Sequence, residues 1–156
     1  MTMQSFRPFD SLQVMAYIIK RCKQKGIYVN ITKLQKLLYC CYGVVLAKFG
    51  VRLTDERPEA WQYGPVFPET LRSIQFFGID AFCQKETPNV DQAPAAILSL
   101  IDATLDHFGK HTALKLSQWT HLPGSPWSKA SLDGQLFFEI LDDNDIKSYF
   151  SEKVLA

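Results

Sequence analysis

Apolar residues recur at helical spacing along much of this chain, and glycine, proline and capping residues separate the segments that carry them. Positions three or four residues apart share one face of a helix, so this spacing predicts a mainly helical protein. The first helix is expected to be capped by Asp10 or Ser11 and to end at Gly26, which suits a left-handed terminal residue. Its apolar stripe consists of Leu12, Met15, Ala16, Ile19 and Cys22.

A second helix is expected to begin near Thr32, where Thr32 and Gln35 match the capping-box pattern, and to end at Phe49-Gly50. Its apolar band is broad, which predicts a central helix with neighbours on several sides. The band comprises Ile31, Leu34, Leu37, Leu38, Cys41, Val44 and Val45. Gly43 lies within this helix at a cost of about 1 kcal/mol relative to alanine, so another element is expected to approach closely there.

The middle of the chain predicts a short strand over 59–63 that breaks at Gly64-Pro65 and is followed by a helix with Pro68 in its first turn. That helix is expected to end at Gly78, and residues 80–90 are expected to form a loop. A fourth helix is predicted with Asp91 as its cap, Pro94 in its first turn and Gly109 at its end.

The last third of the chain predicts a short helix from Thr112 to about Trp119 and a helical turn capped by Ser125 with Pro126 in first position. An apolar strand is expected over 134–141, and Asp142 or Asp143 is expected to cap a final helix. The fold class is therefore mainly α (α+β), with about six helices and a small two- or three-stranded β element. Residues 1–156 are expected to form a single compact domain, because the sequence contains no repeat, linker or low-complexity tract.

The composition is that of an ordinary globular protein, with 47% hydrophobic and 21% charged residues. The sequence has no apolar run of bilayer-spanning length and no signal-peptide pattern, so a cytoplasmic location without membrane contact is expected. The four cysteines form no Cys-x-x-Cys pair, which indicates small buried side chains in a reducing compartment rather than a zinc site.

Charge is distributed unevenly along the chain although the net charge is only +1. Residues 1–54 carry nine basic side chains and one acidic side chain, whereas residues 55–156 carry eight basic and fifteen acidic ones. Such a basic third can serve an acidic partner or nucleic acid, or the acidic remainder can fold against it.

The sequence contains no convincing catalytic or metal-binding pattern. His107 and His111 have a ligand-like spacing, but Gly109 between them is expected to break the helix. The acidic residues at 142, 143 and 145 fit a helix N-terminus better than a Mg²⁺ site. His121 lies in a turn-rich segment, where a hydrogen-bonded turn residue is a simpler interpretation than a catalytic base. We therefore expect a non-enzymatic protein without metal or cofactor.

Aromatic and proline residues near the predicted strand allow two interpretations, core packing or a partner-binding surface. The set consists of Trp61, Tyr63, Pro65, Phe67 and Trp127. Within it, Trp61, Tyr63 and Pro65, together with Gly64, are expected to fix the corner between strand and helix, with Gly64 at a positive φ.

Three ordered sequence blocks carry a family resemblance: ITKLQKLLYCCYGVVLAKFG, EAWQYGPVFPE and LSQWTHLPGSPWSKA. Together they resemble the Panacea (SocA-like) antitoxin domain family, also met as phage-associated proteins, over about residues 10–153. The chain departs from that pattern at Cys40-Cys41, where aromatic or small residues are commoner.

The resemblance implies a mostly helical antitoxin that neutralises a cognate toxin by direct binding and contributes no catalytic residues. Three alternatives stay open: an adaptor that delivers a bound protein to a cytosolic protease, a nucleic-acid-binding regulator, which is less favoured, and an enzyme that uses His121. The positions with an expected partner-binding or structural role are Lys33, Lys36, Tyr39, Trp61, Tyr63, Gly64, Pro65, Thr120, His121 and Trp127.

Overall fold

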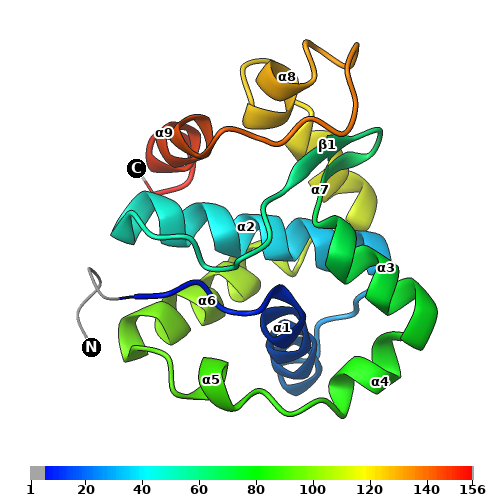
Figure 1. Ribbon diagram of the computed structural model, residues 1–156, viewed down its shortest axis with the longest axis vertical. Coiled ribbons are helices and arrows are strands. Elements are labelled where there is room, and N and C mark those ends of the chain that lie inside the picture. The colour runs from blue at the N-terminus through cyan, green and yellow to red at the C-terminus, as the bar shows by residue number, and fades with distance from the viewer. Residues whose placement is uncertain (1–5, 156) are drawn as a thin grey trace.

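The longest helix, α2 (Ile31–Phe49), runs through the middle of the molecule, and other elements surround it (Figure 1). The computed structural model describes residues 6–155, which form nine helices and one two-stranded sheet. Every residue from Lys33 to Leu46 is buried, because α2 packs against α1, α3, α6, α7, α9 and the sheet. The broad apolar band therefore predicted the central position of this helix correctly.

The two N-terminal helices illustrate how local capping signals succeed and fail. Helix α1 (Ser11–Lys25) is capped by Asp10 and ends at Gly26 with a left-handed conformation, as the sequence predicts. Helix α2 is capped instead by Asn30, whose side-chain oxygen accepts a hydrogen bond from the backbone N–H of Lys33. The expected capping box of Thr32 and Gln35 is wrong, because Gln35 is buried and bonds to a different part of the chain.

The β element is a tight antiparallel hairpin of β1 (Glu59–Trp61) and β2 (Gly64–Val66). In its register Glu59 pairs with Val66 and Trp61 pairs with Gly64. The expected strand over 59–63 is thus shorter, and the Gly64-Pro65 break belongs to a second strand. Segment 134–141, expected to be a strand, does not form a regular one: it makes an isolated bridge between Ile140 and Glu59 and three backbone hydrogen bonds to residues 58–60. Phe138 within it has a φ of +68°.

Three short helices follow the hairpin: α3 (Pro68–Phe77), α4 (Ile79–Cys83) and α5 (Pro88–Asp91). Helix α3 begins and ends where the sequence predicts, with Gly78 at its end. The expectation of a loop over 80–90 is wrong in part, because α4 and α5 occupy much of that segment as short helical turns whose inward residues Phe82 and Val90 are buried.

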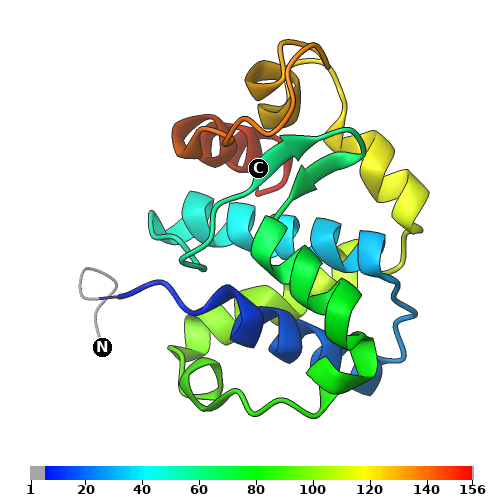
Figure 2. The same ribbon diagram turned by 45° about the vertical axis from the view of Figure 1, so that its right-hand side comes forward.

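The chain then crosses under α2 as α6 (Ala95–Phe108) and returns above it as α7 (Ala113–Thr120), α8 (Pro126–Ala130) and α9 (Asp143–Lys153) (Figure 2). Thr112, Ser125 and Asp142 cap the last three helices through their side chains. The caps at Ser125 and Asp142 are those that the sequence predicts, whereas for Thr112 it predicts only that a helix begins there. Asp91 does not cap α6; it lies at the end of α5, and Pro94 precedes α6 without a side-chain cap.

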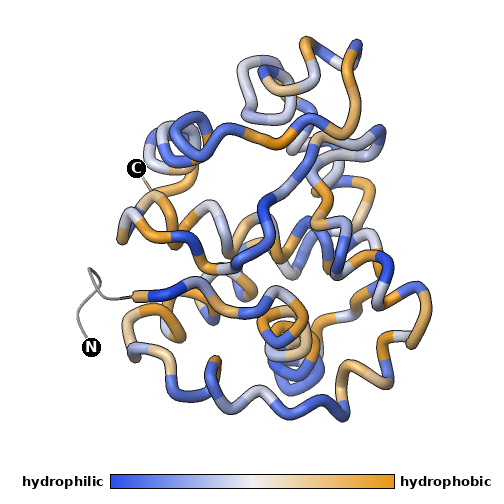
Figure 3. Tube along the Cα trace, in the orientation of Figure 1, coloured by the Kyte–Doolittle hydropathy of each residue, from blue (hydrophilic) through white to orange (hydrophobic). Residues whose placement is uncertain are grey.

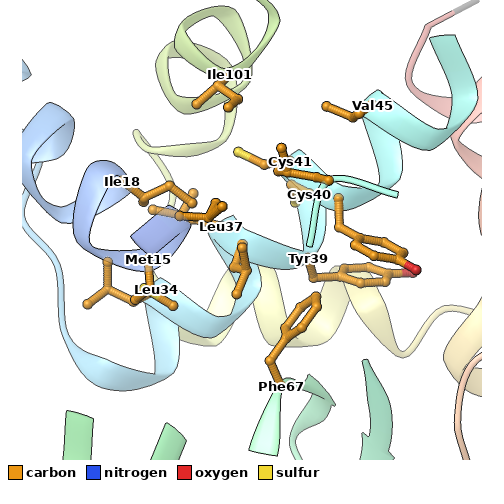
Figure 4. Packing of buried hydrophobic residues seen from close by; sticks show 14 of the residues in the cluster. Met15, Ile18, Leu34, Leu37, Tyr39, Cys40, Cys41, Val45, Phe67 and Ile101 are labelled. Carbon is orange, nitrogen blue, oxygen red and sulfur yellow. The ribbon is translucent and has the colours of Figure 1, made fainter. Parts of the chain in front are cut away.

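Buried side chains form a continuous core around α2. In Figure 3, orange hydrophobic positions recur along α2 and α6, whereas blue hydrophilic positions predominate in the connection between α4 and α5. Figure 4 shows Leu34 and Leu37 of α2 near Met15 and Ile18 of α1, while Tyr39 faces the opposite way. Gly43 lies against the ring of Phe150 from α9, which confirms the predicted close approach.

Ion pairs join several basic side chains of the N-terminal third to acidic side chains later in the chain. Arg21 pairs with Asp102 at 2.9 Å, Lys25 with Asp106 at 2.9 Å, and Arg52 with Asp143 at 2.7 Å. Part of the basic N-terminal third therefore packs against acidic residues that come later in the chain. Within residues 6–155, none of the helices combines the length and apolar character that a bilayer crossing requires.

Candidate functional site

The hairpin corner, which we define as residues 59–66 with the side chains that contact them from α2, α7 and α8, is where most of the singled-out residues meet. Lys36 lies under β2 and donates from Nζ to the carbonyl oxygen of Pro65 at 2.9 Å. Gln35 beside it accepts from the backbone N–H of Phe67 at 2.7 Å and donates to Thr70 Oγ1 at 3.0 Å. Two polar side chains of α2 thus set where the hairpin ends and α3 begins.

Gln35, which lies next to this corner and bonds to Phe67 and Thr70, is the residue whose role sequence reasoning missed. The signal that could have found it is a polar residue on the same helical face as Ile31 and Leu38, which lie four residues before it and three residues after it. A buried amide in such a place requires several hydrogen-bond partners, because leaving its polar atoms unsatisfied costs about 1–3 kcal/mol. A polar side chain within a broad apolar band therefore indicates a long-range bond to another segment.

Lys36 is an unusual lysine, because it is only 1% exposed and no carboxylate lies within ion-pair distance of it among the described residues. Removal from water disfavours its charged form, and this burial lowers its pKa to about 8. The ammonium is therefore charged at neutral pH at a cost to the folded state, and its hydrogen bond to Pro65 offsets part of that cost.

We expect the stability of the wild-type protein, measured relative to Lys36→Met, to rise with pH between about 7 and 9. The folded-state pKa of about 8 lies below the ordinary value of 10.5, so over this interval the unfolded chain binds more protons than the native one, and stability increases with pH. The expected gain is on the order of 1 kcal/mol by pH 9. Urea denaturation of both proteins across that range measures it.

The comparison with Lys36→Met also removes an opposing effect. Burial raises the pKa of Cys22 to about 11, so the stability of either protein falls when its unfolded thiols ionise. That contribution is common to both and cancels in the difference. A stability difference that stays flat from neutral to alkaline pH would show that Lys36 keeps an ordinary pKa in the folded protein.

Gly64 occupies the tightest point of the corner. Its φ is +114°, a conformation that favours glycine, which agrees with the sequence-based expectation. A Cβ atom at this position would lie 2.6 Å from Thr120 Oγ1 and 2.8 Å from Cε of Lys36. Thr120 and Lys36 therefore close over the backbone of β2 from α7 and α2.

His121 connects the same corner to α7 and α8. Its Nε2 lies 2.9 Å from the carbonyl oxygen of Gln62, and its Nδ1 lies 2.5 Å from that of Ser117. The ring rests on Trp127, whose Nε1 donates to the carbonyl oxygen of Trp61 at 2.7 Å. Both ring nitrogens face carbonyl oxygens of the protein itself, so the geometry describes a bridging turn residue.

Two of the singled-out residues lie outside the corner. Tyr39 is 2% exposed and packs edge-on against Phe150 in the core. Lys33 is buried and donates from Nζ to the carbonyl oxygen of Gly109 at 2.6 Å, which ties the start of α2 to the end of α6. The structure thus gathers eight of the ten positions: Lys36, Trp61, Tyr63, Gly64, Pro65, Thr120, His121 and Trp127.

A hollow of about 560 Å³, here called the hairpin hollow, opens beside the corner. Its wall comprises the first turns of α2, the hairpin, α3 and residues Phe137 and Phe138. Trp61 packs edge-on against Phe138 with ring centroids 5.3 Å apart. Because Tyr63 at the hairpin turn is 68% exposed and Phe138 is 66% exposed, the rim of this hollow is unusually apolar.

The remaining candidate groups are engaged in structural contacts. Asp142 caps α9, and Asp143 accepts from Tyr42 Oη at 2.7 Å as well as from Arg52. This confirms the capping interpretation of the acidic cluster. Within the described part of the chain, no three histidine, cysteine, aspartate or glutamate side chains are grouped so that they could hold a metal ion.

A family model described as "Antitoxin SocA-like, Panacea domain" matches residues 34–128, which extend from the first turn of α2 into α8 and contain the whole hairpin. The chain is also 28% identical over 131 residues to Antitoxin SocA of Caulobacter vibrioides (strain NA1000 / CB15N), a match that covers 76% of this chain and 68% of that protein. No solved structure matches.

Proposed function

The chain belongs to the SocA-like, Panacea domain antitoxin family, and from this membership we propose that it is an antitoxin that neutralises a cognate toxin protein by binding it directly. The observation that carries the proposal is the match over residues 34–128 together with its relative, which is itself named an antitoxin. The matched residues include the hairpin corner and part of the wall of the hairpin hollow.

The structure supports a binding role through the character of its surface. Tyr63 and Phe138 expose most of their side chains at the rim of the hairpin hollow, and aromatic side chains of this kind commonly anchor protein interfaces. The interactions inside the corner hold these side chains on a rigid support, which lowers the entropy cost of binding. We place the encounter in the cytoplasm, in keeping with four cysteines that are free thiols.

Co-expression with the protein encoded by the neighbouring reading frame tests the proposal. That protein is produced from an independent inducible promoter, so an effect on its transcription cannot imitate neutralisation. We expect that its expression alone arrests growth, that this chain restores growth, and that the two proteins co-purify while the level of the neighbouring protein stays constant. A Leu37→Asp variant, which places a charge in the core, should fail to restore growth.

Two outcomes would count against direct neutralisation. Growth arrest that persists despite normal levels of this chain, with no complex recovered, would remove the antitoxin proposal. Restored growth accompanied by rapid loss of the neighbouring protein would replace neutralisation by delivery to a protease, and a chase after translation arrest distinguishes the two.

A further inference from the structure

Three hollows beside the start of α2 join into one groove. The hairpin hollow shares Thr32 and Tyr63 with a second hollow of about 490 Å³ against α7. The second shares Ala113 and Leu114 with a third hollow of about 470 Å³, which reaches Tyr28. We call this continuous surface the N-terminal groove, because it follows the N-terminal end of α2. The hairpin, α7 and the start of α2 lie on the same side in Figure 2.

Large apolar side chains stand exposed along the whole groove. Tyr28 is 78% exposed at one end, Leu114 is 69% exposed near the middle, and Tyr63 is 68% exposed where the first two hollows meet. Phe138 at the other end is 66% exposed. Single exposed apolar residues are ordinary, but several around connected hollows mark a surface that a partner covers.

The groove is also basic. Among the residues the structure describes, its lining includes no aspartate or glutamate, whereas it includes Lys33, Lys36, Lys110, His111 and His121. Burial lowers the pKa of His111, and four neighbouring basic side chains lower it further: Lys115, Lys110, His107 and Lys33. Lys110 lines the third hollow, and Lys115 follows the lining residue Leu114 on α7 without lining a hollow itself; both are exposed, and neither forms an ion pair with another described residue. Arg21 and Lys25 of α1 and Arg52 after α2 are paired instead, whereas the exposed Lys48 near the end of α2 also forms no ion pair with a described residue.

From these observations we propose that the N-terminal groove binds the toxin through an acidic segment whose apolar side chains enter the hollows around Tyr63 and Leu114. The inference rests on the proposed antitoxin function and names the surface and the chemistry of its partner. Carboxylates of that segment face Lys110 and Lys115, which form no ion pair within the described part of the chain, so charge complementarity favours such a partner.

The shape of the groove favours a protein segment over nucleic acid. A nucleic acid needs exposed cations along its whole track, because its charge repeats with every nucleotide. The hairpin hollow, the largest of the three, has Lys36 as its one lining residue with a formal charge among those described, and this lysine is buried and bonded to Pro65. The exposed cations are confined to the end near α7, whereas apolar side chains continue throughout.

Binding measurements with the purified product of the neighbouring reading frame test this inference. Tyr63→Ala and Leu114→Ala are each expected to weaken the affinity at least about tenfold, since exposed anchors of this kind carry interface energy and contribute little to folding. The double variant Lys110→Glu/Lys115→Glu is expected to weaken it more than about tenfold near 0.05 M salt, and by much less near 0.5 M.

Matched controls lie elsewhere on the surface. Phe76→Ala removes an aromatic residue that is 82% exposed and lines none of the three hollows. Lys48→Glu/Lys147→Glu reverses two exposed lysines near the opposite end of α2. Both control proteins are expected to bind with wild-type affinity, and circular dichroism melting curves of all variants should match the wild type.

The outcomes separate this inference from the proposed function. If the wild type binds its neighbour and the groove variants bind equally well, the antitoxin proposal stands and the groove assignment is overturned. If the control variants weaken binding as much as the groove variants, the assignment is overturned as well. If the wild type shows no binding to its neighbour but Lys110→Glu/Lys115→Glu abolishes a gel shift of duplex DNA, both proposals give way to a nucleic-acid role.

Discussion

Replacing Gly64 with valine is expected to lower the free energy of unfolding by about 3 kcal/mol, because two separate costs add at this position. A β-branched residue is strained at a φ of +114°. Its Cβ would also overlap Thr120 Oγ1 and Cε of Lys36, at 2.6 and 2.8 Å. Neither neighbour can withdraw freely, since Thr120 bonds to the carbonyl oxygen of Ser117 and Lys36 bonds to that of Pro65. Urea denaturation monitored by circular dichroism measures the loss.

A matched glycine isolates the backbone cost from the packing cost. Gly124 has a φ of +79°, and a Cβ atom there would meet no heavy atom within 4 Å. Gly124→Val is therefore expected to cost only the strain of the left-handed conformation, on the order of 1 kcal/mol. Equal losses at the two glycines would show that α2 and α7 do not close over the hairpin as tightly as the structure indicates.

Helix ends were the part of the fold that the sequence predicted best, because their signals are local. Asp10, Thr112, Ser125 and Asp142 each bond to a backbone N–H two or three residues later. Such a bond depends on a few consecutive residues, so the sequence pattern contains all of it. The error at α2 has the same origin, because Asn30 and Thr32 both satisfy the local pattern and only the burial of Gln35 decides between them.

The hairpin could not be predicted in the same way, because its stability comes from distant residues. Pro65 lies in β2 although proline lacks a backbone N–H, and its carbonyl oxygen is bonded by Lys36, which is 29 residues away in the sequence. In segment 134–141, by contrast, the local sequence predicts a strand that the fold does not form. Its apolar composition favours a strand, but the left-handed conformation of Phe138 interrupts the regular pairing and leaves the bridge at Ile140.

For the candidate site, the sequence predicted the residues of the hairpin corner but not their long-range contacts. Family resemblance selected the residues of the hairpin corner, but no local pattern shows which carbonyl oxygens Lys33, Lys36 or His121 contact. The N-terminal groove was not predicted, because its three hollows combine residues from five separate segments of the chain. The basic character of the first third was visible in the sequence, whereas its separation into paired and unpaired cations required the fold.

The effect of Gly43→Ala on stability is expected to change sign when the ring of Phe150, which lies against Gly43, is removed. In the wild type, Gly43→Ala is expected to cost roughly 2 to 3 kcal/mol, although alanine favours a helix by about 1 kcal/mol. The reason is steric: the new Cβ would lie 2.6 Å from Cδ2 of Phe150 and closer still to two other ring atoms. Phe150 cannot easily move, because it is fully buried and packs against Tyr39 and Trp119.

Removing the Phe150 ring should remove its steric overlap with a Cβ atom at position 43. Phe150→Ala alone is expected to cost about 4 kcal/mol through the lost burial and the cavity that it leaves. In that background Gly43→Ala has no ring to meet, so its helix-forming preference is expected to dominate and to raise stability by up to about 1 kcal/mol. Denaturant unfolding of the wild type, both single variants and the double variant gives the coupling energy directly. If Gly43→Ala lowers the free energy of unfolding equally with and without the Phe150 ring, then α9 does not pack against α2 at Gly43, and other contacts must hold the C-terminal helix in place.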